Sequence, residues 1–341
     1  METLVTSSKP RYIWVDCAKC FSILLVISFH APYHIDGYAG DILQLLRMPA
    51  FFMISGFLFN IDKYPSFHYF IKHRSIQLLV PYTFFFIVFY FFWLTIGRNI
   101  AGGEDLQAPM WRPLFEFFYG TPYLVVAPYW FICCLFSIQL VYYALFKYLP
   151  RAIAIAIVIL CPLLHSIEGI QALPWNLPQA FLYIPFYAFS NQCKTYIATM
   201  SLSRRNCFLT CLSLMLALAG TLHIHDFGET IKDILTVACG ILILPTYILF
   251  IKSIAKIFPK MKKAASFIGK NTIIILALQN YIIGVFKIIL NHIGYDNGNY
   301  GMNILLTLLT VVVCIIPIQI INKYIPFSIG RGTFFEKKLK Q

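Results

Sequence analysis

Long apolar runs that alternate with short polar connections dominate the pattern of the chain. An apolar run of about 20 residues spans a bilayer as a helix. Ten runs fit this description: residues 12–31, 43–60, 76–97, 128–147, 151–166, 178–191, 206–224, 233–251, 271–290 and 302–322. The pattern therefore predicts an all-α polytopic integral membrane protein. We expect one transmembrane domain over 1–341, with a short N-terminal segment (1–11), a ten-helix bundle (12–322) and a basic tail (323–341).

Composition supports a membrane protein and excludes a soluble one. The chain has 341 residues, of which 59% are hydrophobic and 12% charged. A soluble domain of this length has too little interior to cover so much apolar surface. The first apolar run holds Asp16 and Lys19, and no small-residue cleavage site follows it. We therefore expect it to remain as a membrane helix and not to be removed as a signal peptide.

The charges are distributed unevenly between the two sides of the predicted bundle. When successive connections are assigned to alternate sides, 21 of the 27 Lys and Arg residues fall on one side. The other side holds Arg98, Arg112 and Lys232, together with ten acidic residues. Basic loops face the cytoplasm, so this asymmetry predicts both termini there. The formal charge of +13 thus orients the protein in its lipid, and we expect no nucleic-acid partner.

Cysteine and glycine patterns point to no metal and no nucleotide. The ten cysteines lie mostly inside apolar runs, where small hydrophobic packing is their usual role. Cys17 and Cys20 form a C-x-x-C pair, but no second ligand pair follows at a metal-binding spacing. We predict no metal site and no disulfide framework. The absence of a phosphate-binding glycine loop argues against an ATP-driven pump.

A polar stripe on the first predicted span is the leading candidate for chemistry. Asp16, Lys19 and His30 fall within roughly 60° of one another around a helix. Lys19 and His30 are separated by about 16 Å along its axis. Ionisable groups inside a membrane are costly and usually functional. An imidazole can accept a proton from a hydroxyl and return it later, which makes His30 a candidate general base.

Two further residues near the same predicted depth allow two interpretations each. Arg47 begins the second span and either stabilises an oxyanion or anionic substrate, or extends its charge to the interface. His34 follows Pro32, which we expect to end the first helix. It is either an interfacial residue or a member of the His30 site. The Ser55-Gly56 pair favours close helix packing over a nucleophilic serine.

Basic and aromatic residues at other span ends are candidates for substrate contacts. Lys72 and Arg74 enter the third span from the cytoplasmic side and suit a phosphate-bearing ligand, although cytoplasmic anchoring also explains them. Tyr129 and Trp130 open the fourth span, where they either stack on a sugar ring or belong to an interfacial aromatic belt.

These segments together resemble the membrane-bound acyltransferase 3 family. Tyr12 to Lys19, followed by His30, resembles its opening helix, and Arg47 to Phe57 resembles its "MPLFFFISGF" segment. Four later segments are similar to its "R-x-x-R-L-x-x-P-Y", "LWFL", "LPFF" and "GKNS" motifs: Arg74–Tyr82, Tyr129–Phe131, Ile184–Tyr187 and Gly269–Thr272. The lysine before the histidine is most similar to the fucose 4-O-acetylase-like branch, which includes surface-polysaccharide O-acetyltransferases.

The resemblance implies transfer of an acyl group, usually acetyl from acetyl-CoA as the acyl donor, onto a hydroxyl of a surface glycan or its lipid-linked precursor. It implies His30 as the essential histidine, Lys19 as its basic partner and Arg74 as a motif arginine. It also implies a bacterial inner membrane. Three positions depart from the family pattern and affect how donor and acceptor are held: Gln77 replaces a motif arginine, and Arg47 and Gln279 stand where histidines are common.

The residues support a specific hypothesis for the reaction. Acetyl-CoA approaches from the cytoplasm near Lys72, Arg74 and Lys19, and its pantetheine arm reaches His30, where a glycan hydroxyl meets the thioester. Asp16 pairs with Lys19, and Arg47 steadies the oxyanion. Direct transfer and an acyl-histidine relay both fit. A transporter or flippase, which would also use intramembrane charges, is the alternative class. A non-catalytic scaffold would leave the polar stripe unexplained.

Overall fold

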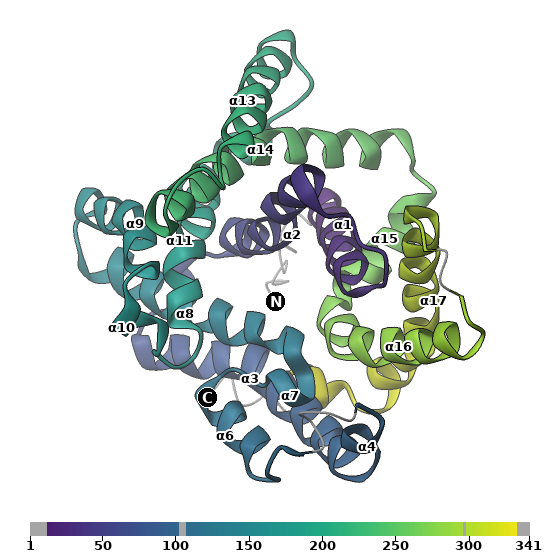
Figure 1. Ribbon diagram of the computed structural model, residues 1–341. Coiled ribbons are helices and arrows are strands. Elements are labelled where there is room, and N and C mark those ends of the chain that lie inside the picture. Colours follow the sequence, from purple (N-terminus) through teal and green to yellow (C-terminus); the bar gives the residue numbers. More distant parts are fainter. Residues whose placement is uncertain (1–11, 102–106, 296–297, 333–341) are drawn as a thin grey trace, which may run out of the picture.

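The computed structural model of the protein describes residues 12–101, 107–295 and 298–332, and within these ranges it is helical, without a strand. The longer helices, shown in Figure 1, are α1 (Ile13–His30), α2 (Gly37–Leu58), α3 (Phe67–Phe92), α8 (Trp130–Tyr148), α9 (Arg151–His165), α11 (Leu177–Gln192), α13 (Arg204–Leu222), α14 (Glu229–Ile257), α15 (Met261–Lys270), α16 (Thr272–His292) and α17 (Tyr300–Tyr324). Short helical segments connect them: η1 (Ile61–Lys63), η2 (Trp93–Gly97), α4 (Arg98–Ala101), α6 (Arg112–Tyr119), α7 (Tyr123–Val126), η3 (Ala127–Tyr129), α10 (Glu168–Gln171), α12 (Lys194–Thr199) and η4 (Pro326–Ile329).

The prediction of an all-α polytopic membrane protein is confirmed. In the described ranges, eight helical stretches are long and apolar enough to cross a membrane. Two of the ten expected spans, 151–166 and 178–191, correspond to α9 and α11, which have 15 and 16 residues. At 1.5 Å per residue these two helices are about 22 and 24 Å long, less than the roughly 30 Å of bilayer hydrocarbon. The division of the chain into a single domain with two short terminal segments stays a prediction.

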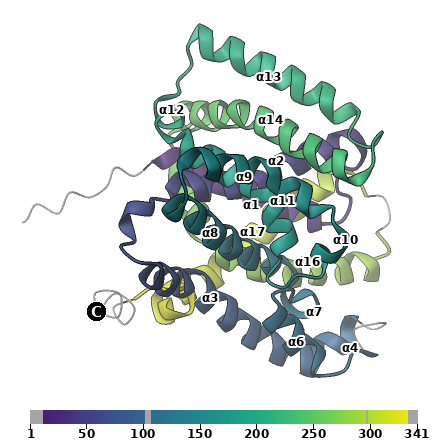
Figure 2. The same ribbon diagram turned by 90° about the vertical axis from the view of Figure 1, so that its left-hand side faces the viewer.

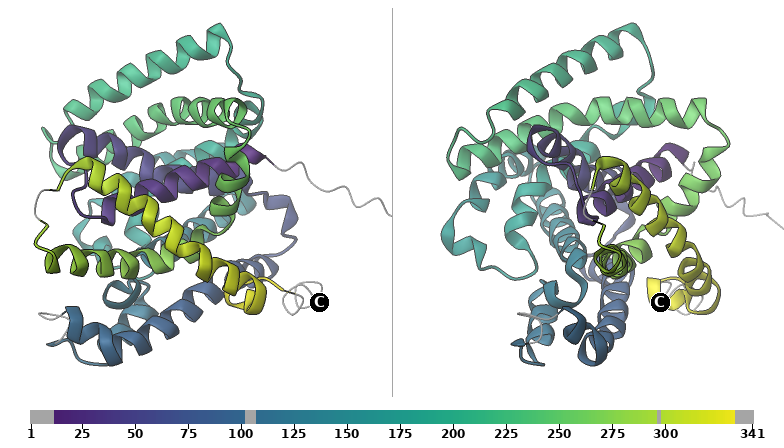
Figure 3. Two further views of the ribbon diagram at one scale, coloured as in Figure 1. Left: turned by 90° about the vertical axis from the view of Figure 1, so that its right-hand side faces the viewer. Right: turned by 45° about the vertical axis from the view of Figure 1, so that its right-hand side comes forward.

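Helix α1 lies toward the inside of the bundle (Figure 1). It packs against α2, α14, α15, α16 and α17, whereas α3, α8, α9 and α11 complete the other side of the ring. The side view in Figure 2 shows α13 as an outer layer over α14. Apart from α14, helix α13 makes only a small contact, with α2. Figure 3 shows α17 running obliquely across α1 and α16. The helix that carries Asp16, Lys19 and His30 is thus packed among other helices on several sides.

The two ends of the bundle differ in charge. The basic end, as we name it, holds the start of α1, α15, the starts of α3 and α16 and the segment after α17; Arg331, for example, donates to the Lys270 carbonyl at 2.8 Å. The acidic end holds the end of α1 and the start of α2. There the Tyr38 hydroxyl donates to the Leu218 carbonyl at 2.8 Å. Several charges used in the prediction of orientation lie outside the described residues: Lys9, Arg11, Glu104, Asp105, Asp296 and the lysines after residue 332.

Glycines allow two close helix contacts that shape the centre of the molecule. A Cβ atom at Gly56 in α2 would lie 2.1 Å from the Tyr187 carbonyl oxygen of α11. A Cβ atom at Gly269 in α15 would lie 2.1 Å from the Asp16 carbonyl oxygen of α1. Only hydrogen fits at either position, because real Cβ atoms do not approach so closely. The packing role predicted for Ser55-Gly56 is therefore confirmed for Gly56.

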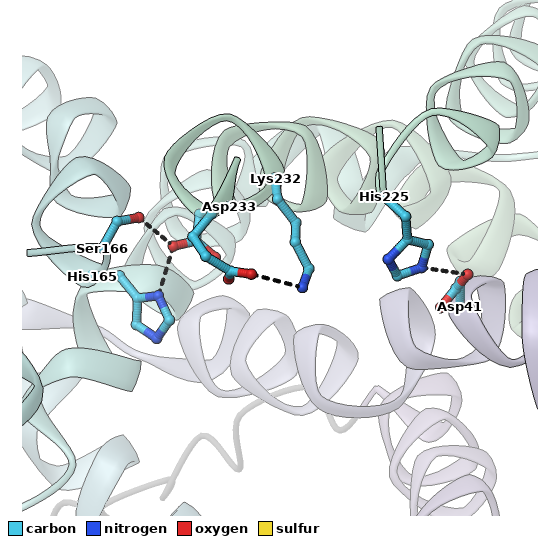
Figure 4. Close-up of polar contacts among 7 residues, drawn as sticks. Asp41, His165, Ser166, His225, Lys232 and Asp233 are labelled. Atoms are coloured by element: carbon cyan, nitrogen blue, oxygen red, sulfur yellow. Dashed lines mark hydrogen bonds and ion pairs between the residues drawn. The ribbon is translucent and has the colours of Figure 1, made fainter. Parts of the chain in front are cut away.

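Histidine–aspartate pairs join distant segments at the acidic end (Figure 4). His165, the last residue of α9, lies with its Nδ1 2.7 Å from Asp233 Oδ2 of α14, and the Ser166 hydroxyl donates to the same oxygen at 2.8 Å. His225 Nε2 lies 3.0 Å from Asp41 Oδ2 at the start of α2. The first group ties α9 to α14, and the second ties the connection between α13 and α14 to α2.

Candidate active site

Helix α1 is held at three depths by residues from three other helices. Near its start, the Ser266 hydroxyl of α15 donates to Asp16 Oδ2 at 3.0 Å. In its middle, the Tyr247 hydroxyl of α14 donates to the Ala18 carbonyl at 2.8 Å. At its end, the Asn303 amide of α17 donates to the carbonyls of Ser28 (2.8 Å) and Pro32 (2.9 Å), on either side of His30. These contacts fix the rotation of α1 and so decide which face looks into the bundle.

The face of α1 that looks into the bundle carries Lys19, Ile23, Val26 and His30. These residues are spaced by four, three and four positions, so they form one row along the helix. The helix ends at His30, since Pro32 cannot continue it and Ala31 is already extended. The expectation that Pro32 ends this helix is confirmed. His30 is half-buried.

A cavity of about 590 Å³ runs along this row from the basic end. Three residues of the row, Lys19, Ile23 and Val26, line it. The rest of its wall comes from the α2 face, the η1 and α3 region, α8 and the start of α16: Met48, Phe51, Ser55, Leu58, Lys63, Tyr64, Tyr69, His73, Arg74, Gln77, Leu78, Phe131, Ile132, Leu135, Gln139, Thr272, Ile273 and Leu276. Its polar residues gather toward the basic end, and its deep end, next to Val26, is apolar.

Arg74 is held in the wall of this large cavity by contacts with three residues. Its guanidinium donates to Gln77 Oε1 at 2.7 Å and lies 5.3 Å from the ring centres of both Phe59 and Tyr64. Gln77 thus supports Arg74 directly at the position where the family pattern has a second arginine. Burial raises the pKa of the Tyr64 hydroxyl, against the opposing effect of Arg74, so the phenol stays protonated and able to donate.

Not every basic residue expected at the donor site lies there. Arg74 and Lys19 line the cavity, whereas Lys72 is not among its lining residues in the part of the chain that the structure describes. Lys63 and His73 line it instead. Residue 72 lies on a different side of α3 from residues 73, 74 and 77, because successive helical positions are rotated by about 100°. The position of Lys63 in the cavity wall could not be predicted from helical spacing, because Lys63 lies in the short segment η1 and not in a long helix.

His30 is surrounded by cations and an aromatic ring. Arg47, Lys287 and His34 lie near enough to His30 to interact with it electrostatically. The Arg47 guanidinium lies 3.6 Å from the centre of the Phe29 ring, and the same ring is 5.3 Å from His30 and 5.5 Å from His34, centre to centre. The structure therefore brings His30, Arg47 and His34 together, and it adds Lys287 of α16.

A small pocket of about 120 Å³ opens on the acidic side of this cluster. Arg47 and His34 line it, together with Ser28, Phe29, Asp36, Asp41, Gln44 and other residues of the α1–α2 region. Its wall holds acceptors, amides and a guanidinium, the groups that hydrogen-bond hydroxyls. Two of its carboxylates are positioned by histidines: Asp36 Oδ1 is 3.0 Å from His34 Nε2, and Asp41 is paired with His225.

The remaining predicted site residues lie away from these two openings. Asp16 is buried where α15 contacts α1. Its hydrogen bond with Ser266 holds the start of α1 against α15. Tyr129 is 0% exposed, and its hydroxyl donates to the Ile273 carbonyl at 3.3 Å, which leaves no ring face open for a sugar or for the interface. Trp130 is half-buried, with its ring 6.4 Å from that of Tyr183.

The arrangement places an imidazole between two openings of different chemistry. Val26 is the cavity-lining residue of α1 nearest to His30, and four positions separate them, about 6 Å along the helix. On the other side, His34 and Arg47 line the small pocket and lie near His30, which itself lines neither opening in the described residues. His30 is a candidate proton acceptor with cations nearby. A large cavity with basic residues at one end lies on one side of it, and a small polar pocket lies on the other, an arrangement that suits transfer of a group between two substrates.

The family model described as an acyltransferase domain matches residues 12–319. This chain belongs to the acyltransferase 3 family. Comparison with curated proteins and with solved structures finds no match. The protein is therefore an integral membrane acyltransferase by family. The matched residues include His30 and those that line the two openings.

Proposed function

We propose that the protein is a membrane O-acetyltransferase that moves the acetyl group of acetyl-CoA to a hydroxyl of a cell-surface polysaccharide or of its lipid-linked sugar precursor. The observation that carries this proposal is the row on α1, which lines the large cavity from Lys19 to Val26 and presents His30 one turn later. The family supplies acyl transfer, and the row supplies a route from a basic opening to a proton acceptor.

The basic end faces the cytoplasm in this proposal, because lysine- and arginine-rich connections remain there during insertion. The protein would then be a multi-pass protein of the bacterial inner membrane, with both termini inside. Acetyl-CoA is cytosolic, so its entry at the basic end follows. Arg74, Lys63 and Lys19 offer cationic donors for its phosphates, and Tyr64 offers a hydroxyl. The apolar deep end beside Val26 suits the uncharged end of the pantetheine arm.

The acceptor enters from the other side. The small pocket provides carboxylate, amide and guanidinium groups for sugar hydroxyls, from Asp36, Asp41, Gln44 and Arg47. It replaces Tyr129 as the acceptor contact, because Tyr129 is enclosed. Trp130 is retained only as a half-buried neighbour of the site. The finer assignment to a fucose 4-O-acetylase-like activity belongs to this proposal and rests on the lysine in the first motif.

The reaction follows from these positions. His30 takes the proton from the acceptor hydroxyl while its oxygen attacks the thioester carbonyl, which forms a tetrahedral intermediate with a negative oxygen. Arg47 stabilises that charge. Collapse of the intermediate breaks the C–S bond, forms the ester and passes the proton from His30 to the departing thiolate. An acyl-histidine relay uses the same residues in two steps, with His30 as the nucleophile.

Transfer of labelled acetyl groups tests this proposal. Purified protein in lipid nanodiscs, given acetyl-labelled acetyl-CoA and the organism's own glycan, should produce labelled glycan. His30→Ala should reduce transfer at least about 100-fold, the lower bound for loss of a general base. His292→Ala is the matched control, since His292 is an exposed histidine at the end of α16, whereas His30 is half-buried beside Arg47. Normal transfer by His30→Ala would overturn the assignment of His30, and glycan translocation without transfer would favour a transporter.

A further inference from the structure

Gln279 of α16 is buried without a hydrogen-bond partner. Its side chain is 0% exposed, and neither Oε1 nor Nε2 has a partner within the described structure. A buried carboxamide that leaves both ends unsatisfied carries a desolvation penalty, and such groups in native proteins usually have a specific use. The amide groups of Asn303 and Asn191, by contrast, donate to two backbone carbonyls each.

Gln279 lies close to the wall of the large cavity, although it does not line the cavity in the described residues. Thr272, Ile273 and Leu276 of α16 line the cavity, and Gln279 follows Leu276 by three residues, about 4.5 Å further along the same face. Lys287, two turns beyond Gln279 on that face, is one of the charges that act on His30. Helix α16 also packs directly against α1. Along α16, Gln279 therefore lies between Leu276, which lines the cavity, and Lys287, which lies near His30.

The thioester must occupy this depth if a donor enters through the cavity and reacts beside His30. We propose that the Gln279 carboxamide binds the thioester group of the donor, with Nε2 donating to the thioester carbonyl oxygen and Oε1 accepting from the nearest amide N–H of the pantetheine arm. One planar side chain then satisfies both of its ends with ligand groups that are only a few bonds apart. This inference rests on the proposed function, since it assumes a pantetheine thioester as the donor.

The proposed contact has a consequence for the reaction. The thioester carbonyl oxygen becomes negative when the acceptor attacks, and an N–H donor that is already in place stabilises that charge without reorganisation. A neutral amide provides this bond whatever the protonation state of His30. Arg47, on the acidic side, and Gln279, on the cavity side, would then approach the developing oxyanion from opposite directions.

Kinetics of apolar variants test the proposal. Gln279→Leu and Gln279→Met should fold with a melting temperature equal to or above that of the wild type, because they remove two unsatisfied groups. Their kcat for acetyl transfer should fall about 100-fold, as when one oxyanion donor is removed. Their KM for acetyl-CoA should change by less than about threefold, because phosphate contacts at the basic end supply most of the binding.

Two other buried polar side chains provide matched comparisons. Thr307→Val removes the unpartnered hydroxyl of a buried residue on another helix, α17, and it should leave kcat and KM unchanged. Gln139→Leu removes a buried amide that lines the cavity nearer the basic end, and it should raise KM more than it lowers kcat. Wild-type kcat in both Gln279 variants, or failure of both to fold, would overturn the proposal.

A vibrational measurement separates this proposal from the proposed function. Acetyl-CoA labelled with ¹³C at the thioester carbonyl, bound to His30→Ala protein to prevent turnover, should show its carbonyl stretch shifted to lower frequency. Adding Gln279→Leu should abolish the shift while the donor stays bound. An unshifted carbonyl in His30→Ala protein would overturn the role of Gln279 even if transfer is normal. Absence of any transfer by the wild type would instead refute the proposed function.

Discussion

At the scale of single residues, the spacing of Lys19 and His30 places both on one side of α1, because residues at helical spacing share a face; their function stays a prediction. Residues of other elements could not be found in this way. Lys63 and His73 line the cavity, Lys287 lies near His30, and Asn303 holds the end of α1. Each of them lies near α1 because of how the helices pack, and no local sequence pattern indicates that position.

Arg74 gives the residue-scale prediction. Arg74→Gln should raise the KM for acetyl-CoA about tenfold or more, because it removes a charge-assisted contact to a phosphate, and kcat should change little. Lys72→Gln is the control: it removes a neighbouring charge on α3 that does not line the cavity in the described residues, so its KM should stay within about twofold. Steady-state kinetics at fixed ionic strength measure both. An equal effect of the two substitutions would mean that only the general positive charge of this end matters.

At the scale of elements, the hydrophobic runs predicted where the helices lie along the chain, but they did not indicate which helices pack together. Eight runs became helices of membrane-spanning length, and the two shortest runs became α9 and α11. The charges of the basic 252–270 segment indicate no more than a cytoplasmic anchor. In the structure its second half forms α15, which packs on α1 through Gly269. The charges of a segment do not reveal that one of its glycines fits against a distant backbone.

Gly269 gives the element-scale prediction. Gly269→Ala should lower the melting temperature by an amount equivalent to about 1–3 kcal/mol, because the added methyl group meets the Asp16 carbonyl oxygen and must move α15 or α1. Transfer activity should fall as well, since α15 sets the position of the row that carries Lys19. Gly284→Ala in α16 is the control, as its added methyl group would meet no atom within 4 Å. Thermal unfolding of both variants in the same detergent would decide between packing and helix propensity.

At the scale of the whole molecule, the contacts that join α9, α14 and α2 hold the acidic end together. Asp233 is 7% exposed and accepts from both His165 and Ser166, whereas His225, the partner of Asp41, is largely exposed. Exposed ion pairs contribute little, because water and salt screen them, but a buried carboxylate with two partners contributes more.

Asp233 gives the prediction at this scale. Asp233→Asn should destabilise the folded protein by about 1–3 kcal/mol, since it removes a buried charge-assisted contact. Asp41→Asn should cost less than about 1 kcal/mol. Melting temperatures at low and high salt measure both effects, and only that of Asp41→Asn should diminish with salt. A larger effect of Asp41→Asn would show that the exposed pair, and not the buried one, connects the helices at this end.

The sequence by itself determined the membrane class, the all-α architecture, the two differently charged ends and the Lys19–His30 row, because each of these depends on composition or on helical spacing along one segment. The tertiary structure decided that the row lines a cavity from Lys19 to Val26, that Lys72 lies outside this cavity, that Tyr129 is enclosed and that Gln279 is buried without a hydrogen-bond partner in the part of the chain that the structure describes. These features depend on how α1 is rotated and which helices surround it. That rotation is set by Tyr247, Ser266 and Asn303, which lie 229, 250 and 275 residues beyond their partners along the chain, and no local pattern encodes contacts over such separations.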